Sequence, residues 1–158
     1  MSELSAEFNI KGMGPLKHFV GCHIIENETK DTVWIHQPKL LADLKQKFGK
    51  QVAGERVFNT PAAPRTMIMR PQEGDKLISP EMQTIFRSGV GMLLCLVKHS
   101  RPEISNAVRE LTKVVDGATP GHWKAMNRAI KYVIDTENFK IETKQEERVV
   151  LFGRNLRQ

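Results

Sequence analysis

Cysteine is scarce in this sequence, and the patterns of zinc sites and membrane spans are missing. The only two cysteines, Cys22 and Cys95, lie in separate apolar runs, which predicts two buried thiols in a reducing compartment. The five histidines form no His-Glu-x-x-His or other metal-ligand spacing. The longest apolar run, residues 90–97, is far too short to cross a bilayer. No secretory signal opens the chain, so we expect a cytoplasmic or nuclear protein with no membrane partner.

Motifs of the common catalytic sites are also missing. There is no Gly-x-Ser-x-Gly elbow and no Gly-rich phosphate loop, and adjacent acids such as Glu146 and Glu147 lie in an expected turn. We therefore expect no catalytic residue, no bound metal and no cofactor in this chain. Basic charge is what the sequence has in excess, since 24 Lys and Arg against 18 Asp and Glu give a net charge of +6. That excess favours polyanions such as nucleic acid, although many small basic proteins bind none.

The first third of the chain predicts a β-hairpin followed by a helix. Two runs of β-forming residues, 17–25 and 32–35, flank a polar turn and predict an antiparallel pair. A helix is expected from Pro38, which suits a first helical position, to Gly49, which suits a C-terminal stop. Its expected apolar face consists of Leu40, Leu41, Leu44 and Phe48. On the opposite side, Asp43 and Lys47 are spaced i,i+4 and are expected to pair.

Residues 50–79 have no sustained period and predict an extended connector, because Pro and Gly interrupt them repeatedly. Three helices are expected beyond it, each with proline at its first position: Pro80, Pro102 and Pro120. Ser79 and Thr119 are the expected N-caps of the first and third helices.

The first of these three helices has two contrasting faces. Large apolar side chains gather on one side and small residues on the other, which predicts a neighbour on both and a close one at the small face. The small face consists of Thr84, Ser88, Gly91 and Cys95.

The end of the chain predicts a second hairpin, residues 139–143 against 148–152. The fold class is therefore α+β: a β-hairpin plus helix, a long Pro-containing connector, a three-helix subregion and a C-terminal β-hairpin. These expectations divide the chain into four regions: 1–49, 50–79, 80–137 and 138–158.

Five segments, taken together and in order, resemble the reverse transcriptase of Ty1/copia-type retrotransposon polyproteins. "FNIKGMGPLKHFVGCHI" (8–24) resembles that family's Phe-x-Met-Lys-Asp-Leu-Gly-x-Leu-x-Tyr-Phe-Leu-Gly, and "HQPKLLADLKQKFG" (36–49) resembles the helix that follows it. Asn59-Thr60-Pro61 matches a Thr-Pro of its connector. "FRSGVGMLLCLVKHSRPEISNAVRELTKV" (86–114) and "PGHWKAMNRAIKYVIDT" (120–136) resemble its Tyr-Arg-x-x-Val-Gly and His-Trp-x-Ala segments. Each fragment alone is weak, but five in register are strong.

This resemblance implies the C-terminal part of an RNA-directed DNA polymerase, beyond the catalytic palm. The first hairpin would be the primer grip, the helices would be the thumb and connection, and residues 148–153 would begin a truncated ribonuclease H domain. The family's Tyr-x-Asp-Asp is expected before residue 8, so the chain is expected to be inactive alone, with Mg²⁺ bound only in the absent palm. The implied partner is an RNA–DNA or DNA duplex, bound without sequence preference.

Nine residues are the candidate contacts with nucleic acid. They are Lys17, His18, Gly21, Lys39, Lys45, Arg101, Lys124, Arg128 and Lys131. Lys124, Arg128 and Lys131 are spaced i, i+4, i+7 and predict one basic stripe, which fits a phosphate-contacting face or a solvated one. Arg101 fits a phosphate contact or a cap on the carbonyls of the preceding helix equally well.

Two other hypotheses stay open. The helices of a decayed mobile element could form a non-catalytic module that self-associates or packs with the rest of a polyprotein. Alternatively, residues 120–136 could be the recognition helix of a stand-alone DNA-binding protein, although few base-reading side chains are present. His122 and Trp123 could stack on nucleic acid, but Trp123 lies on the apolar face, which favours burial in the core.

Overall fold

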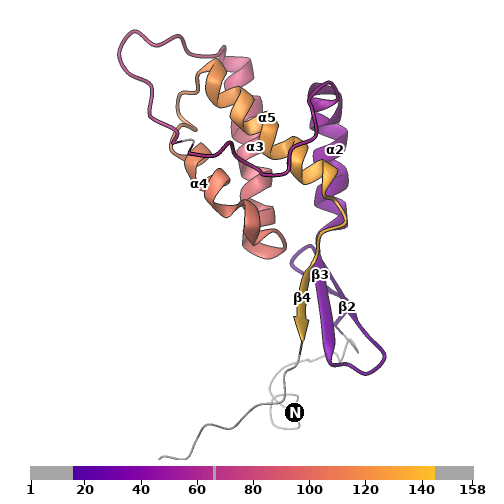
Figure 1. Cartoon of the computed structure of the whole chain (residues 1–158). Helices are drawn as coiled ribbons and strands as arrows, with labels where there is room; N and C mark the ends of the chain where they lie inside the picture. The colour runs from indigo at the N-terminus through magenta and orange to yellow at the C-terminus, as the bar shows by residue number, and fades with distance from the viewer. Residues whose placement is uncertain (1–15, 66, 145–158) are drawn as a thin grey trace, which may run out of the picture.

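A computed structural model describes residues 16–65 and 67–144, which form a helical body and a small β-sheet beneath it (Figure 1). The elements are β1 (His18–Phe19), β2 (Cys22–Glu26), β3 (Thr32–His36), α2 (Pro38–Val52), α3 (Pro80–His99), the 3₁₀ helix η1 (Pro102–Ile104), α4 (Ser105–Thr112), α5 (Pro120–Asp135) and β4 (Ile141–Lys144). The sheet is antiparallel in the order β1-β2-β3-β4. The predicted α+β class is confirmed.

The strand predicted over residues 17–25 is wrong as a single element, because the chain reverses within it. Val20 and Gly21 both have positive φ, 48° and 77°, as in the tight turns that connect neighbouring antiparallel strands. Phe19 therefore pairs with Cys22 across a two-residue turn, and β1 and β2 form a hairpin of their own. The β2–β3 turn is held by Asn27, whose Oδ1 accepts hydrogen bonds from the backbone N–H groups of Asp31 and Thr32 at 3.1 Å each.

The last strand, β4, has a neighbour in the sheet that was not predicted. β4 lies beside β3, with Val33 opposite Thr143, and the Trp34 indole N–H donates to a Glu142 carboxylate oxygen at 3.1 Å. The predicted partner strand, residues 148–152, lies outside the described residues. The sheet therefore joins the two ends of the described chain.

The helix predicted over residues 38–49 continues through Gly49 to Val52, so that predicted end is wrong. Val52 is only 1% exposed. The free energy gained by burying it exceeds the helix propensity lost at Gly49, so the helix continues for another turn. α2 packs along α5, with α3 and α4 completing the body (Figure 1). The fully buried side chains at the centre include Leu44, Phe48, Phe86, Leu93, Ile104, Met126 and Ile130.

Both predicted N-caps are confirmed. The Ser79 hydroxyl accepts a hydrogen bond from the Met82 backbone N–H at 3.3 Å. Thr119 accepts from the His122 N–H at 3.4 Å, and His122 Nδ1 accepts in return from the Thr119 N–H at 3.1 Å, which completes a capping box with histidine in place of Glu or Gln. The helix predicted after Pro102 is shorter than expected, since it starts as η1 and α4 ends at Thr112.

α3 is closely packed on one side only, which contradicts the two-sided packing predicted for it. A Cβ built on the exposed Gly91 would have nothing within 4 Å. A Cβ on the buried Gly89 would meet Met126 Sδ at 2.7 Å and Phe48 Cζ at 3.2 Å. The close approach of helices therefore falls on the apolar side of α3. On the small face, Thr84 and Gly91 are exposed, whereas Ser88 and Cys95 are half-buried.

Cysteine placement follows the prediction at one of the two positions. Cys22 is buried, and burial, followed by the neighbouring Cys95, raises the pKa of its thiol. Cys95 is half-buried on the small face of α3, where the Gln37 side-chain amide lies 3.8 Å from its Sγ.

The segment between α2 and α3 contains no helix or strand within the described residues, and it crosses in front of α5 and α4 (Figure 1). Ile68 anchors it, because the side chain is buried and its backbone N–H donates to the Glu110 carboxylate at 3.1 Å. This segment, residues 53–79, is called the connector below.

Candidate nucleic-acid interface

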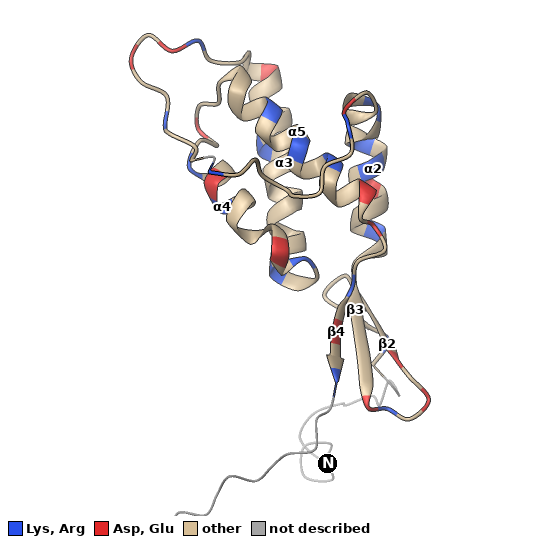
Figure 2. Cartoon of the chain, viewed as in Figure 1, with Lys and Arg blue, Asp and Glu red and all other residues tan. Residues whose placement is uncertain are grey.

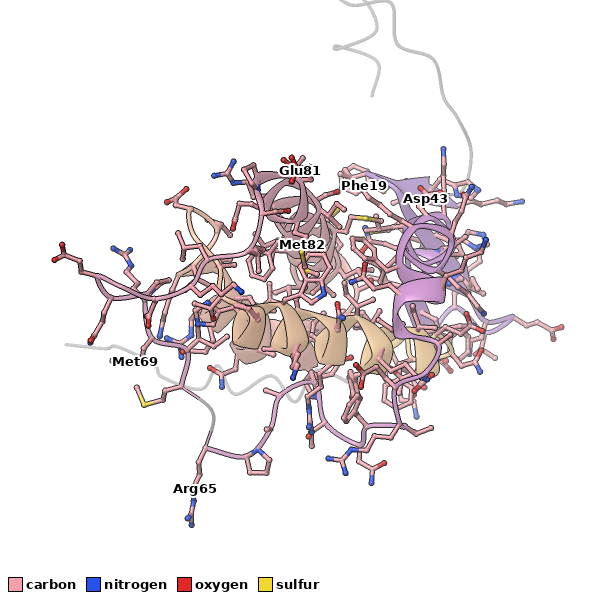
Figure 3. All side chains as sticks on the ribbon, turned by 90° about the horizontal axis from the view of Figure 1, so that it is seen from above. Phe19, Asp43, Arg65, Met69, Glu81 and Met82 are labelled. Carbon is pink, nitrogen blue, oxygen red and sulfur yellow. The ribbon has the colours of Figure 1, made fainter. Side chains whose placement is uncertain are left out.

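The outward face of α2 carries three exposed lysines, one of which, Lys39, is a predicted contact. Lys39, Lys47 and Lys50 are spaced i, i+8, i+11 and are exposed on one side of the helix. Asp43 is the single acid among them, and it lies on the side of α2 turned away from α5 (Figures 2 and 3). None of these three lysines forms a salt bridge with another described residue. Lys50 was missed because the helix was predicted to end before it.

The predicted Asp43–Lys47 pair does not form, because Lys47 turns toward α3. Its ammonium group donates to the Ser88 hydroxyl at 2.6 Å and lies 5.8 Å from the centre of the Phe48 ring. The lysine thereby bridges α2 and α3.

A cleft of about 440 Å³ continues this basic surface where the sheet meets the helical body. His36, Lys45, Glu137 and Lys140 line it together with the first turn of α2. Lys45 pairs with Glu137 at 3.1 Å, but both side chains are about half exposed, so water and salt weaken this pair. Lys140 was not predicted as a contact; it reaches the cleft only because β4 pairs with β3.

Three histidines form a row across the sheet beside this cleft. His18 lies opposite His23, and His23 lies opposite His36. The rings of His18 and His23 stack with centroids 4.7 Å apart, and His36 Nε2 lies 3.2 Å from His23 Nδ1. That short distance requires at least one neutral ring, since two protonated rings offer no acceptor. Burial, followed by the charges of Lys140 and His23, lowers the pKa of His36.

The other two predicted contacts of the hairpin have local structural roles. The Lys17 carbonyl accepts a hydrogen bond from the Ile24 N–H at 2.9 Å, while its side chain is exposed. Gly21 was predicted to allow close approach of the primer strand. Its φ of +77° already accounts for glycine at this turn, and the space around its Cβ position is open.

Arg101 is buried and has a structural role, so it is no longer a candidate contact with nucleic acid. It is 1% exposed, and its guanidinium donates to the Thr136 carbonyl at 3.1 Å and the Thr136 hydroxyl at 2.6 Å. It also pairs with Glu103 and lies over the rings of Tyr132 and Phe139. The arginine caps a helix, as one of the two predictions held, but the helix is α5 and not the preceding α3.

The predicted stripe on α5 is not a continuous free surface. Arg128 donates to the Thr60 carbonyl and hydroxyl at 3.2 and 2.9 Å and lies 4.4 Å from the centre of the Phe58 ring. Lys131 pairs with Asp135 and is largely buried. Lys124 alone is exposed without an ion pair to another described residue. The periodicity was correct, but the connector covers the middle of this stripe.

The recognition-helix hypothesis for residues 120–136 is wrong. α5 lies between α2, α3, α4 and the connector, and much of its surface is buried. Asn127, its one uncharged base-reading candidate, is 6% exposed and accepts a hydrogen bond from the Gln51 side chain at 2.6 Å. Trp123 packs against the core, as its place on the apolar face predicted.

Two further features were searched for within residues 16–65 and 67–144. No group of three or more His, Cys, Asp or Glu side chains there is placed to hold a metal ion. Among the helices of those ranges, none is both long and apolar enough to cross a membrane.

The sequence aligns along most of its length with large transposon proteins. The Retrovirus-related Pol polyprotein from transposon TNT 1-94 of Nicotiana tabacum is 23% identical over 141 residues, 85% of this chain and 10% of that protein. The polyprotein from transposon RE1 of Arabidopsis thaliana is 30% identical over 146 residues, and that from transposon RE2 is 26% identical over 145. Each alignment covers 92% of this chain and 9% of the Arabidopsis protein.

The retrotransposon polyprotein resemblance is thus confirmed at the level of the polyprotein. The chain spans about a tenth of the length of these curated relatives. No protein-family profile matches the sequence, and no solved structure matches it.

Proposed function

We propose that this chain is the thumb and connection part of a retrotransposon reverse transcriptase, and that it grips the backbone of a primer–template duplex without polymerising. Two kinds of observation support this. The segments that resemble the family follow the family's order from residue 8 to residue 153, and the relatives are Retrovirus-related Pol polyproteins. The chain has no Tyr-x-Asp-Asp motif, so we expect no nucleotide incorporation.

The observation that carries the proposal is the outward face of α2. Lys39, Lys47 and Lys50 stand on a helix that is held rigidly against α5 and α3, and Lys45 and Lys140 extend the charge into the cleft. Phosphates need point charges on a fixed scaffold, and lysine ammonium groups supply them without reading base edges. This surface therefore fits a sugar–phosphate strand and gives no means of choosing a sequence.

Fluorescence anisotropy with a labelled RNA–DNA duplex over a salt series tests the proposal. Neutralising phosphates releases counterions, so the logarithm of affinity should fall with the logarithm of salt concentration with a slope of about −3. Two duplexes of unrelated sequence should bind equally well. Affinity that does not change with salt would contradict the proposal.

Matched charge variants locate the contact. Lys39→Gln combined with Lys50→Gln should weaken binding and reduce the slope by about 2. Arg70→Gln combined with Lys76→Gln removes the same charge from the exposed loop of the connector, at the far left of Figure 1 from α2. If this control pair weakens binding as much, the effect is one of net charge and the α2 face is not the site.

The exposed part of the small face of α3 favours a second candidate, a non-catalytic interaction module. Gly91 leaves this face open, and Leu94 and Ile85 on its flanks are 44% and 38% exposed. In a longer polyprotein another region could cover it, whereas alone it could self-associate. Concentration-dependent sedimentation without duplex binding would favour this candidate over the first.

A further inference from the structure

A second hollow lies on the opposite side of the helical body, between the connector and helices α4 and α5. This connector cavity has a volume of about 260 Å³. Its walls are largely apolar and include Phe58, Ala63, Ile68, Ala107, Leu111 and Ala125. In Figure 3 the labelled Arg65 marks this side of α5, and Asp43 marks the opposite side, where α2 turns its lysines outward. The cavity shares no lining residue with the α2 face or its cleft.

Two polar clamps hold the connector in place around this cavity. Near one end, Arg128 binds Thr60 and covers the Phe58 ring. Near the other, Glu110 accepts from the Ile68 N–H and pairs with Lys113 at 2.6 Å. The connector is therefore fixed by specific bonds on both sides of a space that its own side chains do not fill. Apolar walls that face an unfilled space lack dispersion contacts that a bound molecule would supply.

Charge at the cavity selects among molecules that could enter. Arg128 and Lys124 contribute two positive charges, and Glu55 contributes one negative charge. The Glu110 carboxylate is neutralised by Lys113 and by Arg109 at 3.3 Å, and its bonds to Lys113 and the Ile68 N–H lower its pKa. The net balance of about one positive charge favours a ligand with one negative charge.

We propose that the connector cavity binds a small aromatic monoanion, with its ring against the apolar walls and its acid group near Lys124. An apolar cavity of about 150 Å³ takes up benzene, so this larger one has room for a two-ring aromatic molecule. This inference does not depend on duplex binding, because the two sites share no residue.

Titration with naphthalene-2-sulfonate, followed by calorimetry and by amide chemical shifts in two-dimensional NMR, tests the proposal. We expect saturable binding of one molecule, with shifts concentrated in residues 58–68, 107–111 and 124–128. The neutral naphthalene-2-sulfonamide should bind more weakly, by about threefold, because it lacks the attraction of one exposed charge. Absence of saturation, or shifts spread over α2 and the sheet, would overturn the proposal.

Two variants make the test specific. Ala125→Leu fills the cavity and should weaken binding of both probes at least about tenfold. Lys124→Gln changes only an exposed side chain, so folding is not at risk, and it should weaken the sulfonate to the affinity of the sulfonamide while it leaves the sulfonamide unchanged. Lys50→Gln, on the α2 face, is the charge-matched control and should change neither. If Lys124→Gln weakened the binding of both probes equally, or of neither, Lys124 would not bind the acid group and the proposal would be wrong.

Discussion

Arg101 had two predicted roles, a phosphate contact and a helix cap, and the residues around it in the sequence do not decide between them. An arginine beside proline at the end of a helix can reach a phosphate or a backbone carbonyl equally well. The decision depends on Thr136, which is distant in sequence but lies where the Arg101 guanidinium can donate to both its carbonyl and its hydroxyl. The guanidinium group thereby fixes the C-terminal end of α5, from which the chain continues to β4.

Arg101→Met should therefore lower the free energy of unfolding by about 2–3 kcal/mol, because the carbonyls at the end of α5 lose a charged donor. Arg101→Lys should recover only part of this loss, since an ammonium group cannot make the same fork of bonds. Urea denaturation measures both, with the exposed Arg70→Gln as control. Duplex affinity of the folded variant should be unchanged; a loss of affinity with full stability would restore Arg101 as a phosphate contact.

Two glycines of α3, two residues apart, should respond to alanine in opposite directions. Gly91→Ala should raise the free energy of unfolding by about 0.5–1 kcal/mol, because alanine favours the helix and the added methyl meets nothing within 4 Å. Gly89→Ala should lower it by about 1–2 kcal/mol, since the methyl would press on Met126 and Phe48 in the core. Urea midpoints of the two variants provide the comparison. Stabilisation by both would mean that α3 is not packed at Gly89 as described.

At the scale of elements, helix starts could be predicted from the sequence and helix ends could not. Ser79 and Thr119 make bonds to residues three positions along, so the signal is complete within one turn. The end of α2 depends on Val52, whose burial is decided by tertiary packing. Gly49, a strong local stop signal, is overruled for the same reason.

Strand pairing could be predicted across a local turn, as for β2 and β3, but not between strands far apart in the sequence. β4 was recognised near its true position, but its partner β3 lies more than a hundred residues earlier, and nothing in the local pattern points to it. The histidine row follows from this kind of information too. Only the turn at Val20 and Gly21 brings His18 opposite His23, and a one-residue change of register would have turned them to opposite faces.

Because of His36 in β3 and His122 in α5, we expect the free energy of unfolding to decrease in acid. Burial, more than any other cause, lowers the pKa of both His36 and His122 from the ordinary value of 6.5. The folded state therefore binds fewer protons than the unfolded state, and stability present above pH 6.5 is lost as pH falls through the lowered values. Urea midpoints at pH 7.5, 6.5 and 5.5 should decrease in that order.

Substitution separates the two contributions. His36→Gln should flatten part of the pH dependence by removing the buried imidazole of the sheet, and His122→Gln should flatten the part that belongs to the cap of α5. A pH profile equally steep in the double variant would show that neither histidine is responsible. The window stays above the range in which carboxylates take up protons.

For the whole molecule, the distribution of charge depends on how the connector runs. Lys124, Arg128 and Lys131 are evenly spaced on α5, yet the connector binds Arg128 and the helix neutralises Lys131 itself. The exposed lysines without ion pairs therefore gather on α2 and not on α5, because the connector does not cross α2 (Figure 2). A sequence pattern gives the face on which a charge lies, but not what covers that face.

Burial is just as uneven, and it predicts that the sheet unfolds before the helical body. Cys22 is the only buried apolar residue of the four strands, whereas the helices, the connector and the turn between α4 and α5 supply all the others of the described core. Regions with little buried apolar surface open at low free energy. The two tryptophans report on the two parts separately: Trp34 bonds to Glu142 between β3 and β4, and Trp123 packs on the core.

Trp123→Phe leaves Trp34 as a reporter of the sheet, and Trp34→Phe leaves Trp123 as a reporter of the helical body. In urea, the fluorescence of Trp34 should change at a midpoint about 1 M lower than that of Trp123, while far-UV circular dichroism of both variants follows the helices. Amide hydrogen exchange of the unsubstituted chain provides the control, with Ile24 and Ile35 expected to exchange faster than Leu44 and Ile130. Coincident midpoints together with equal protection would contradict this prediction, because they require the sheet and the helices to unfold as one cooperative unit.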